Sequence, residues 1–184
     1  MPAVLDKLVT IEEFAKYPEP ADGSREELVR GTVITLAPPK ARHGIICQNI
    51  ARMLGQFVHS RRLGWVASND TGVIIERDPD TLRGADVAYW SIEREPVMPE
   101  GYFESVPDLV VEVLSPDDRK KAVREKIQDY VSSGVKLVWL VDPEVRTVTV
   151  YAGSMRGAEL DESETITGGD ALPGFSCKVA DFFG

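Results

Sequence analysis

A charged residue inside a buried-strand pattern is the feature that most restricts how this chain can fold. Residues 108–114 (DLVVEVL) are apolar except for their first residue and Glu112, and a basic helical pattern over residues 118–133 follows directly. A further apolar run occupies residues 135–141. Strand, helix and strand in this order predict a βαβ unit with two parallel strands, and therefore an α/β or α+β fold.

The carboxylate of Glu112 needs a partner in such a strand. A buried lone carboxylate costs several kcal/mol unless it is paired, protonated or bound to metal. In a βαβ unit the helix runs back along its strand, so Lys126, about 12 Å along the helix, can lie over Glu112, about 10 Å before the strand end. A structural ion pair between Glu112 and Lys126 is one interpretation, and a metal site is the other.

A second strand carboxylate supports the metal interpretation. Asp86 lies in GADVAYW, with the apolar neighbours Val87 and Ala88. Two strand carboxylates and a nearby backbone carbonyl form an all-oxygen site suited to Mg²⁺ or Mn²⁺. A cation held there polarises a phosphate and activates water, while a lysine orients the water or stabilises charge.

The rest of the chain predicts further strands and helices around this unit. The patterns indicate one mixed central sheet flanked by helices. We expect a short helix over 10–18, a hairpin over 27–36, a helix over 41–64, a strand–turn–strand over 71–90, a loop over 91–107, a strand over 144–152, a polar loop over 153–170 and a short strand with a final helical turn over 172–183.

The charge distribution is uneven, although the net charge of −9 argues against a nucleic-acid partner. Residues 28–68 contain no acidic residue and six basic ones. One basic face on an acidic body could hold phosphates. A solvated helix surface is the alternative. The six basic residues are Arg30, Lys40, Arg42, Arg52, Arg61 and Arg62.

Composition and length place the chain among ordinary globular proteins. Its 184 residues fit one domain, 1–184. No apolar run is long enough to span a bilayer, and the first residues lack the pattern of a signal peptide. Cys47 and Cys177 are too few and too unpatterned for a disulfide framework or a zinc site. We therefore expect a cytoplasmic protein without a membrane partner.

The chain resembles the Uma-two (Uma2) family, whose members are described as restriction-type endonucleases of the PD-(D/E)XK nuclease superfamily. The resemblance runs from about Glu27 to Phe183, and LVVEVLSP with the lysine-bearing helix is its most specific part. It implies a restriction-endonuclease-like core and divalent-metal-dependent hydrolysis of phosphodiester bonds. The matching stretches are EELVRGTVI, RHGIICQNIARML, GADVAYW, PDLVVEVLSPDDRKKAVREKIQDYVSSGV, VWLVDPEVRTVTVY and LPGFSCKVADFF.

The resemblance also assigns roles to single residues. It makes the carboxylates of two strand residues, and the carbonyl that follows the second, the metal ligands: Asp86, Glu112 and Val113. It makes Lys126 a helix lysine that replaces the strand lysine of the superfamily, and places Glu27 and His43 near the site. The chain departs from the superfamily motif at two positions, with Ala85 before the first carboxylate and Leu114 where the strand lysine would stand.

The sequence therefore predicts an endonuclease that uses Mg²⁺ or Mn²⁺ and acts on DNA as a homodimer. A catalytically silent domain of the same fold, which binds nucleic acid or a protein, is the alternative. A hydrolase of small phosphoesters is a third interpretation, which the basic segment disfavours. The residues expected to contact DNA are Arg42, Arg52, Arg61, Arg62 and Arg119.

Overall fold

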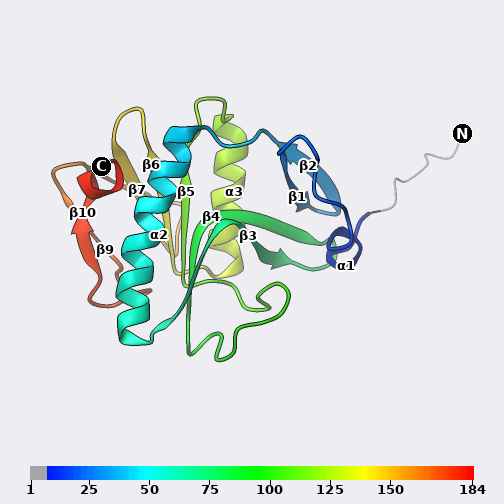
Figure 1. Ribbon diagram of the computed structural model, residues 1–184, viewed down its shortest axis with the longest axis horizontal. Helices are drawn as coiled ribbons and strands as arrows, with labels where there is room; N and C mark the ends of the chain where they lie inside the picture. The colour runs from blue at the N-terminus through cyan, green and yellow to red at the C-terminus, as the bar shows by residue number, and fades with distance from the viewer. Residues whose placement is uncertain (1–7) are drawn as a thin grey trace, which may run out of the picture.

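The core of the fold is a mixed β-sheet of eight strands within residues 8–184, the part of the chain that the computed structural model describes. The strand order is β2-β1-β4-β5-β6-β7-β8, with β3 paired to β4, and β1 and β2 lie at the opposite end from β7 (Figure 1). The strands are β1 (Arg25–Val29), β2 (Thr32–Leu36), β3 (Gly64–Glu76), β4 (Thr81–Ser91), β5 (Leu109–Val113), β6 (Leu137–Asp142), β7 (Thr147–Ala152) and β8 (Ala158–Asp161).

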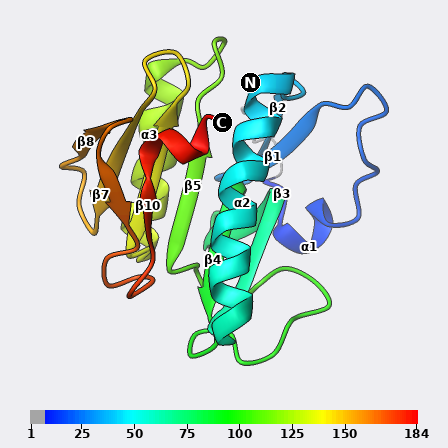
Figure 2. The ribbon, with the colours of Figure 1, turned by 60° about the vertical axis from the view of Figure 1, so that its left-hand side comes forward.

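Two long helices and a small C-terminal sheet complete the fold. A two-stranded sheet of β9 and β10 leads into the 3₁₀ helix η1, which lies beside α2 (Figure 2). No helix within residues 8–184 is long and apolar enough to cross a membrane. The remaining elements are α1 (Ile11–Phe14), α2 (Ala41–Arg61), α3 (Lys120–Ser133), β9 (Thr165–Thr167), β10 (Ser176–Lys178) and η1 (Val179–Phe182).

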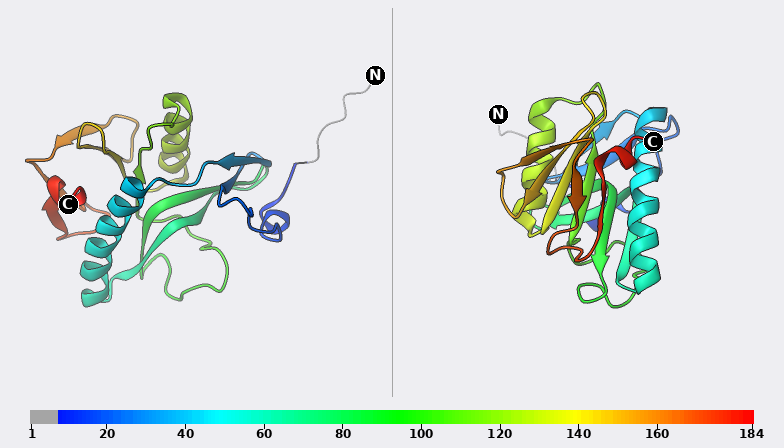
Figure 3. Two further views of the ribbon diagram at one scale, coloured as in Figure 1. Left: turned by 45° about the horizontal axis from the view of Figure 1, so that its top comes forward. Right: turned by 90° about the vertical axis from the view of Figure 1, so that its left-hand side faces the viewer.

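The large sheet lies between α2 and α3, as the right-hand view of Figure 3 shows. Alternate residues of β5 point toward α2 and toward α3, because successive side chains of a strand point to opposite faces of the sheet. Val111 and Val113 pack in the cluster that contains the buried face of α2. Val110 packs with Ile127 of α3. Glu112 has the parity of Val110, so its carboxylate points toward α3.

The predicted βαβ unit is present. Strands β5 and β6 pair in parallel, with Glu112 opposite Leu140, and α3 connects them. All other paired strands named here are antiparallel. Helix α3 ends at Gly134, whose φ of 96° belongs to the left-handed region that glycine adopts without strain. The mixed sheet flanked by helices confirms the predicted fold class.

Three predicted boundaries were wrong. Residues 81–84, expected in a turn, are the first residues of β4, and β3 begins at Gly64 rather than near residue 71. The first half of β3 lacks the alternation of apolar and polar residues that marks a strand in a sequence. It forms a strand because it pairs with β4. The polar loop expected over 153–170 contains β8 and β9, which are short and mostly exposed.

Candidate active site

A cleft of about 470 Å³ opens where β1, β4, β5 and α3 meet. The cleft is lined by every residue that the sequence and the family resemblance predicted for catalysis or metal binding. These residues come from five elements that are far apart in the chain, and the fold brings them together. They are Glu27, His43, Asp86, Glu112, Val113 and Lys126.

The ammonium group of Lys126 joins the two glutamates of the cleft. Its Nζ lies 2.8 Å from Oε2 of Glu112 and 2.9 Å from Oε1 of Glu27. It also donates a hydrogen bond of 2.7 Å to the carbonyl of Gly84. The contact between Lys126 and Glu112 expected from helix and strand rise is therefore present.

Glu112 is held by Lys126 on one oxygen and by the hydroxyl of Tyr130 on the other, at 2.8 Å. Burial, together with the nearby carboxylates of Asp86 and Glu27, raises the pKa of Glu112 to about 8 despite the lysine. Burial alone would lower the pKa of Lys126, but the same three carboxylates raise it. The lysine therefore stays protonated, and Glu112 holds its proton to a higher pH than an exposed glutamate does.

Asp86 lies on the other side of the cleft. Its Oδ2 accepts a hydrogen bond of 2.7 Å from the Val113 N–H and lies 3.2 Å from Nε2 of His43. Burial would raise the pKa of Asp86, but the contacts with His43 and the charge of Lys126 lower it. The pKa of His43 is raised, because the Asp86 carboxylate outweighs the opposing effect of burial. Asp86 is therefore ionised, whereas the neighbouring Glu112 holds its proton more tightly.

A buried ion network, which the sequence analysis missed, supports Glu27. The guanidinium of Arg83 lies 2.9 Å from Glu27 and 2.6 Å from Asp129 on α3. Burial would raise the pKa of Glu27, but Lys126 and Arg83 hold it below its ordinary value. Arg83 interrupts an apolar strand as Glu112 does, and that was the available sequence signal. Asp129 carried no such signal, because a helix usually turns its acids to solvent.

Arg25 and Asp70 form an ion pair next to Asp86 that the sequence also did not indicate. Strand β3 has an irregular register between Ser68 and Thr71. At that bulge the φ of Asp70 is 56°, in the left-handed region. Bulges commonly redirect a side chain at a functional site. Here the bulge brings Asp70 close to Asp86. Burial and the carboxylate of Asp86 raise the pKa of Asp70, although Arg25 opposes this increase.

The six basic residues of the segment 28–68 are not one free cationic face. Three of them pair with acids from elsewhere in the fold: Arg30 with Asp129, Lys40 with Asp117 and Arg42 with Glu144. The other three are exposed on or just after α2 and have no ion pair within residues 8–184. We refer to these three as the α2 arginines: Arg52, Arg61 and Arg62.

The expected DNA-contacting residues therefore lie at different distances from the cleft. Arg119 is the N-cap residue of α3 and lines the cleft itself. Arg61 is eighteen residues after His43 on α2, which corresponds to about 27 Å along the helix axis. Contacts at the cleft and contacts at the C-terminal end of α2 would thus involve well-separated phosphates.

The mixed sheet with helices on both faces is a restriction-endonuclease-like fold, and two strand carboxylates lie beside a lysine in its cleft. The chain belongs to the Uma2 family, described as "putative restriction endonuclease", which matches residues 11–180. Its fold is similar to that of a "putative nuclease belonging to DUF820" from Anabaena variabilis ATCC 29413. The two structures share a TM-score of 0.81 and 23% sequence identity over 95% of this chain and 97% of the other. Comparison with curated proteins gave no match.

Proposed function

We propose that this protein is a divalent-metal-dependent endonuclease that hydrolyses phosphodiester bonds in DNA. The observation that carries the proposal is the meeting of Asp86, Glu112 and Lys126 in one cleft. This arrangement supports a nuclease function because the chain belongs to the Uma2 family, which is described as "putative restriction endonuclease". We further propose that residues 1–184 act as one domain.

The donor set of the cleft suits a hard cation such as Mg²⁺ or Mn²⁺. Asp86 and Glu112 offer carboxylate oxygens, the ligands that these ions prefer, and a bound cation would displace the proton that the raised pKa of Glu112 favours. Leu114 donates its N–H to Val141 of β6, so the peptide groups of Val113 face the opposite edge, where its N–H reaches Asp86. That edge also suits the Val113 carbonyl as a further ligand. A bound cation would polarise the scissile phosphate and lower the pKa of the attacking water.

The protein groups have separate tasks in this proposal. Lys126 is protonated, so it donates hydrogen bonds and stabilises negative charge on the phosphate instead of removing a proton from water. Glu27 and the carbonyl of Gly84 hold its ammonium group in place. Tyr130 fixes the position of Glu112 through its hydroxyl. His43 orients Asp86 through the contact at its Nε2 atom.

The proposed substrate contacts extend beyond the cleft. Arg119 at the cleft would bind the phosphates next to the cleavage point. The α2 arginines lie up to about 27 Å away, which corresponds to about eight base pairs of duplex DNA. Paired cuts on duplex DNA would favour a symmetric homodimer, which presents one cleft to each strand. We also propose a cytoplasmic location, which suits the free thiols of Cys47 and Cys177.

Plasmid cleavage tests the proposal directly. Supercoiled DNA incubated with the protein and Mg²⁺ or Mn²⁺ should be nicked or linearised, and chelation by EDTA should stop the reaction. Glu112→Gln and Lys126→Met should abolish cleavage. Lys121→Met is the matched control, because Lys121 lies on the same helix and is almost fully exposed. Intact DNA after incubation with either metal at several pH values would contradict the proposal.

One observation favours a second candidate, the catalytically silent binding domain. Both carboxylate oxygens of Glu112 accept hydrogen bonds from protein groups, Lys126 and Tyr130, as they would in a structural ion pair. If that is its role, the protein should retain DNA in a gel-shift assay without cutting it in either metal. Binding should then survive Glu112→Gln but fall when the α2 arginines are replaced.

A further inference from the structure

A second hollow, of about 200 Å³, lies next to the cleft and shares Asp86 with it. Three side chains with metal-binding atoms line it beside Asp86: His43, Cys47 and Asp70. His43 and Cys47 are four residues apart on α2, so they lie on the same face of the helix. The nuclease proposal gives no task to Cys47 or to this hollow.

The ligand atoms of His43, Cys47 and Asp86 are close together. The thiol sulfur of Cys47 lies 3.4 Å from Nδ1 of His43, and Nε2 of the same ring lies 3.2 Å from Oδ2 of Asp86. One ligand atom from each residue can be chosen so that all three lie within 4.8 Å of one another. A tetrahedral zinc site needs such atoms roughly 3.3–3.6 Å apart. Shifts of about 1 Å into the hollow would therefore close the site.

We propose that His43, Cys47 and Asp86 form a binding site for a borderline-soft divalent cation of the Zn²⁺ class. Nitrogen, sulfur and oxygen donors together are a typical zinc set, whereas Mg²⁺ takes oxygen ligands. Three protein ligands leave the fourth position to water. On binding, the Cys47 S–H bond breaks, the sulfur–metal bond forms and the proton leaves to solvent. Sequence spacing hides this site, because Asp86 comes from a different element than the two helix residues.

The same three residues also resemble a cysteine protease triad, but the thiol does not suit that role. Burial and the carboxylates of Asp86 and Asp70 raise the pKa of Cys47 far above its ordinary value. A nucleophilic cysteine needs a depressed pKa, which positive neighbours provide. Metal coordination, in contrast, supplies the positive charge that the thiolate requires.

The shared carboxylate gives the site a consequence for the cleft. The carboxylate of Asp86 could bridge two cations, but a zinc ion in the hollow would then lie close to a magnesium ion beside Glu112, and the repulsion between the two charges would weaken magnesium binding. This consequence rests on the proposed nuclease function, and it makes zinc an inhibitor of the magnesium-dependent reaction. Zinc binding itself does not depend on that function.

Cobalt(II) spectroscopy tests the site without any activity measurement. Titration of the reduced, metal-free protein with Co²⁺ should give a thiolate-to-cobalt charge-transfer band with a stoichiometry of one, and Zn²⁺ should remove the band by displacing cobalt. Cys47→Ser should abolish the band and weaken Zn²⁺ binding at least about 100-fold, since even residues behind a ligand contribute 10–100-fold. His43→Ala should weaken binding as well.

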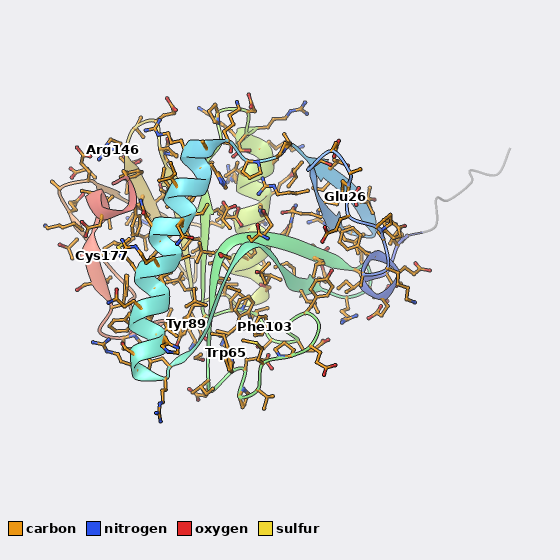
Figure 4. The ribbon with its side chains drawn as sticks, in the orientation of Figure 1. Glu26, Trp65, Tyr89, Phe103, Arg146 and Cys177 are labelled. Atoms are coloured by element: carbon orange, nitrogen blue, oxygen red, sulfur yellow. The ribbon has the colours of Figure 1, made fainter. Side chains whose placement is uncertain are left out.

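Cys177→Ser is the matched control, because Cys177 lies on β10 in the C-terminal sheet (Figure 4). It should keep the band. Glu112→Gln should also keep it, although this variant loses the response to magnesium, so the zinc site and the nuclease proposal fail independently. Absence of the band in the wild type, or a band that survives Cys47→Ser, overturns the inference.

Discussion

Replacing Glu112 with glutamine should not destabilise the metal-free protein, whereas replacing Lys126 with methionine should. Glutamine has the shape of the protonated acid that a pKa of about 8 indicates. Its carbonyl can accept from Lys126, and its amide can donate to the Tyr130 hydroxyl, which has the Gly84 carbonyl 3.5 Å away. Methionine in place of Lys126 leaves two buried glutamates without the cation that they share.

The magnitudes follow from burial and proton linkage. Lys126→Met should lower the free energy of unfolding by about 3–5 kcal/mol, the usual cost of a buried charge that loses its partner. The raised pKa of Glu112 means that the folded state holds its proton more tightly than the unfolded chain. This contribution is fully present below pH 4.5 and is lost as the pH rises to about 8. The loss is about 1.4 kcal/mol per pH unit within that window.

Glu112→Gln lacks this titration. Its free energy of unfolding should match that of the wild type near pH 4.5 and exceed it by up to a few kcal/mol at pH 8. Magnesium should bind the folded wild type and raise its free energy of unfolding by about 2.7 kcal/mol at 100 times the dissociation constant, so that its melting temperature also rises. The Gln variant should lose that response.

Urea unfolding followed by tryptophan fluorescence, and thermal melts with and without Mg²⁺ or Mn²⁺, measure these quantities. Lys121→Met, on the exposed face of α3, controls for loss of a helix lysine. The reasoning is refuted if Glu112→Gln and Lys126→Met both lose about 3–5 kcal/mol at pH 8 and metal leaves the wild type unchanged. Glu112 would then be the ionised structural partner of Lys126.

Three further outcomes are expected. Replacing the α2 arginines one at a time with alanine should weaken DNA binding and lower the slope of log affinity against log salt by about 1 each, as measured by fluorescence anisotropy; unchanged slopes would make them a solvated surface. Arg83→Leu should cost about 3–5 kcal/mol in urea unfolding, because Glu27 and Asp129 lose their cation, and wild-type stability would contradict the network. Tyr130→Phe should cost about 1–3 kcal/mol by leaving a Glu112 oxygen unsatisfied, and an unaltered unfolding curve would show that water replaces the hydroxyl.

The βαβ unit and the Lys126–Glu112 contact were predictable because both lie within one short, continuous segment of the sequence. Strand rise and helix rise fix where two residues lie along a short connected segment, and Lys126 is 14 positions from Glu112. The apolar residues around Glu112 also marked its strand as buried. Glu112, the residue that most restricted the folds compatible with the sequence, also lines the cleft.

The partners of Arg83 were not predictable in the same way. Glu27 is 56 positions away and Asp129 is 46 positions away, so no spacing rule connects them. Asp70 reaches the hollow beside Asp86 because a bulge places its backbone in the left-handed region, and no pattern of residue types indicated this position. The short strands β8 and β9 were missed because exposed strands lack apolar alternation.

The strand order also has a consequence for the time course of folding. The hairpins β1–β2, β3–β4 and β6–β7 close between neighbouring segments, whereas Lys126 must meet Glu27 across about half of the chain. Contacts of such large sequence separation are the slowest to form, because chain entropy opposes their closure. We expect the charged cluster to assemble after the transition state. Destabilising variants of the cleft, such as Lys126→Met, should then refold at the wild-type rate and unfold faster, so that the cluster sets the lifetime of the folded protein.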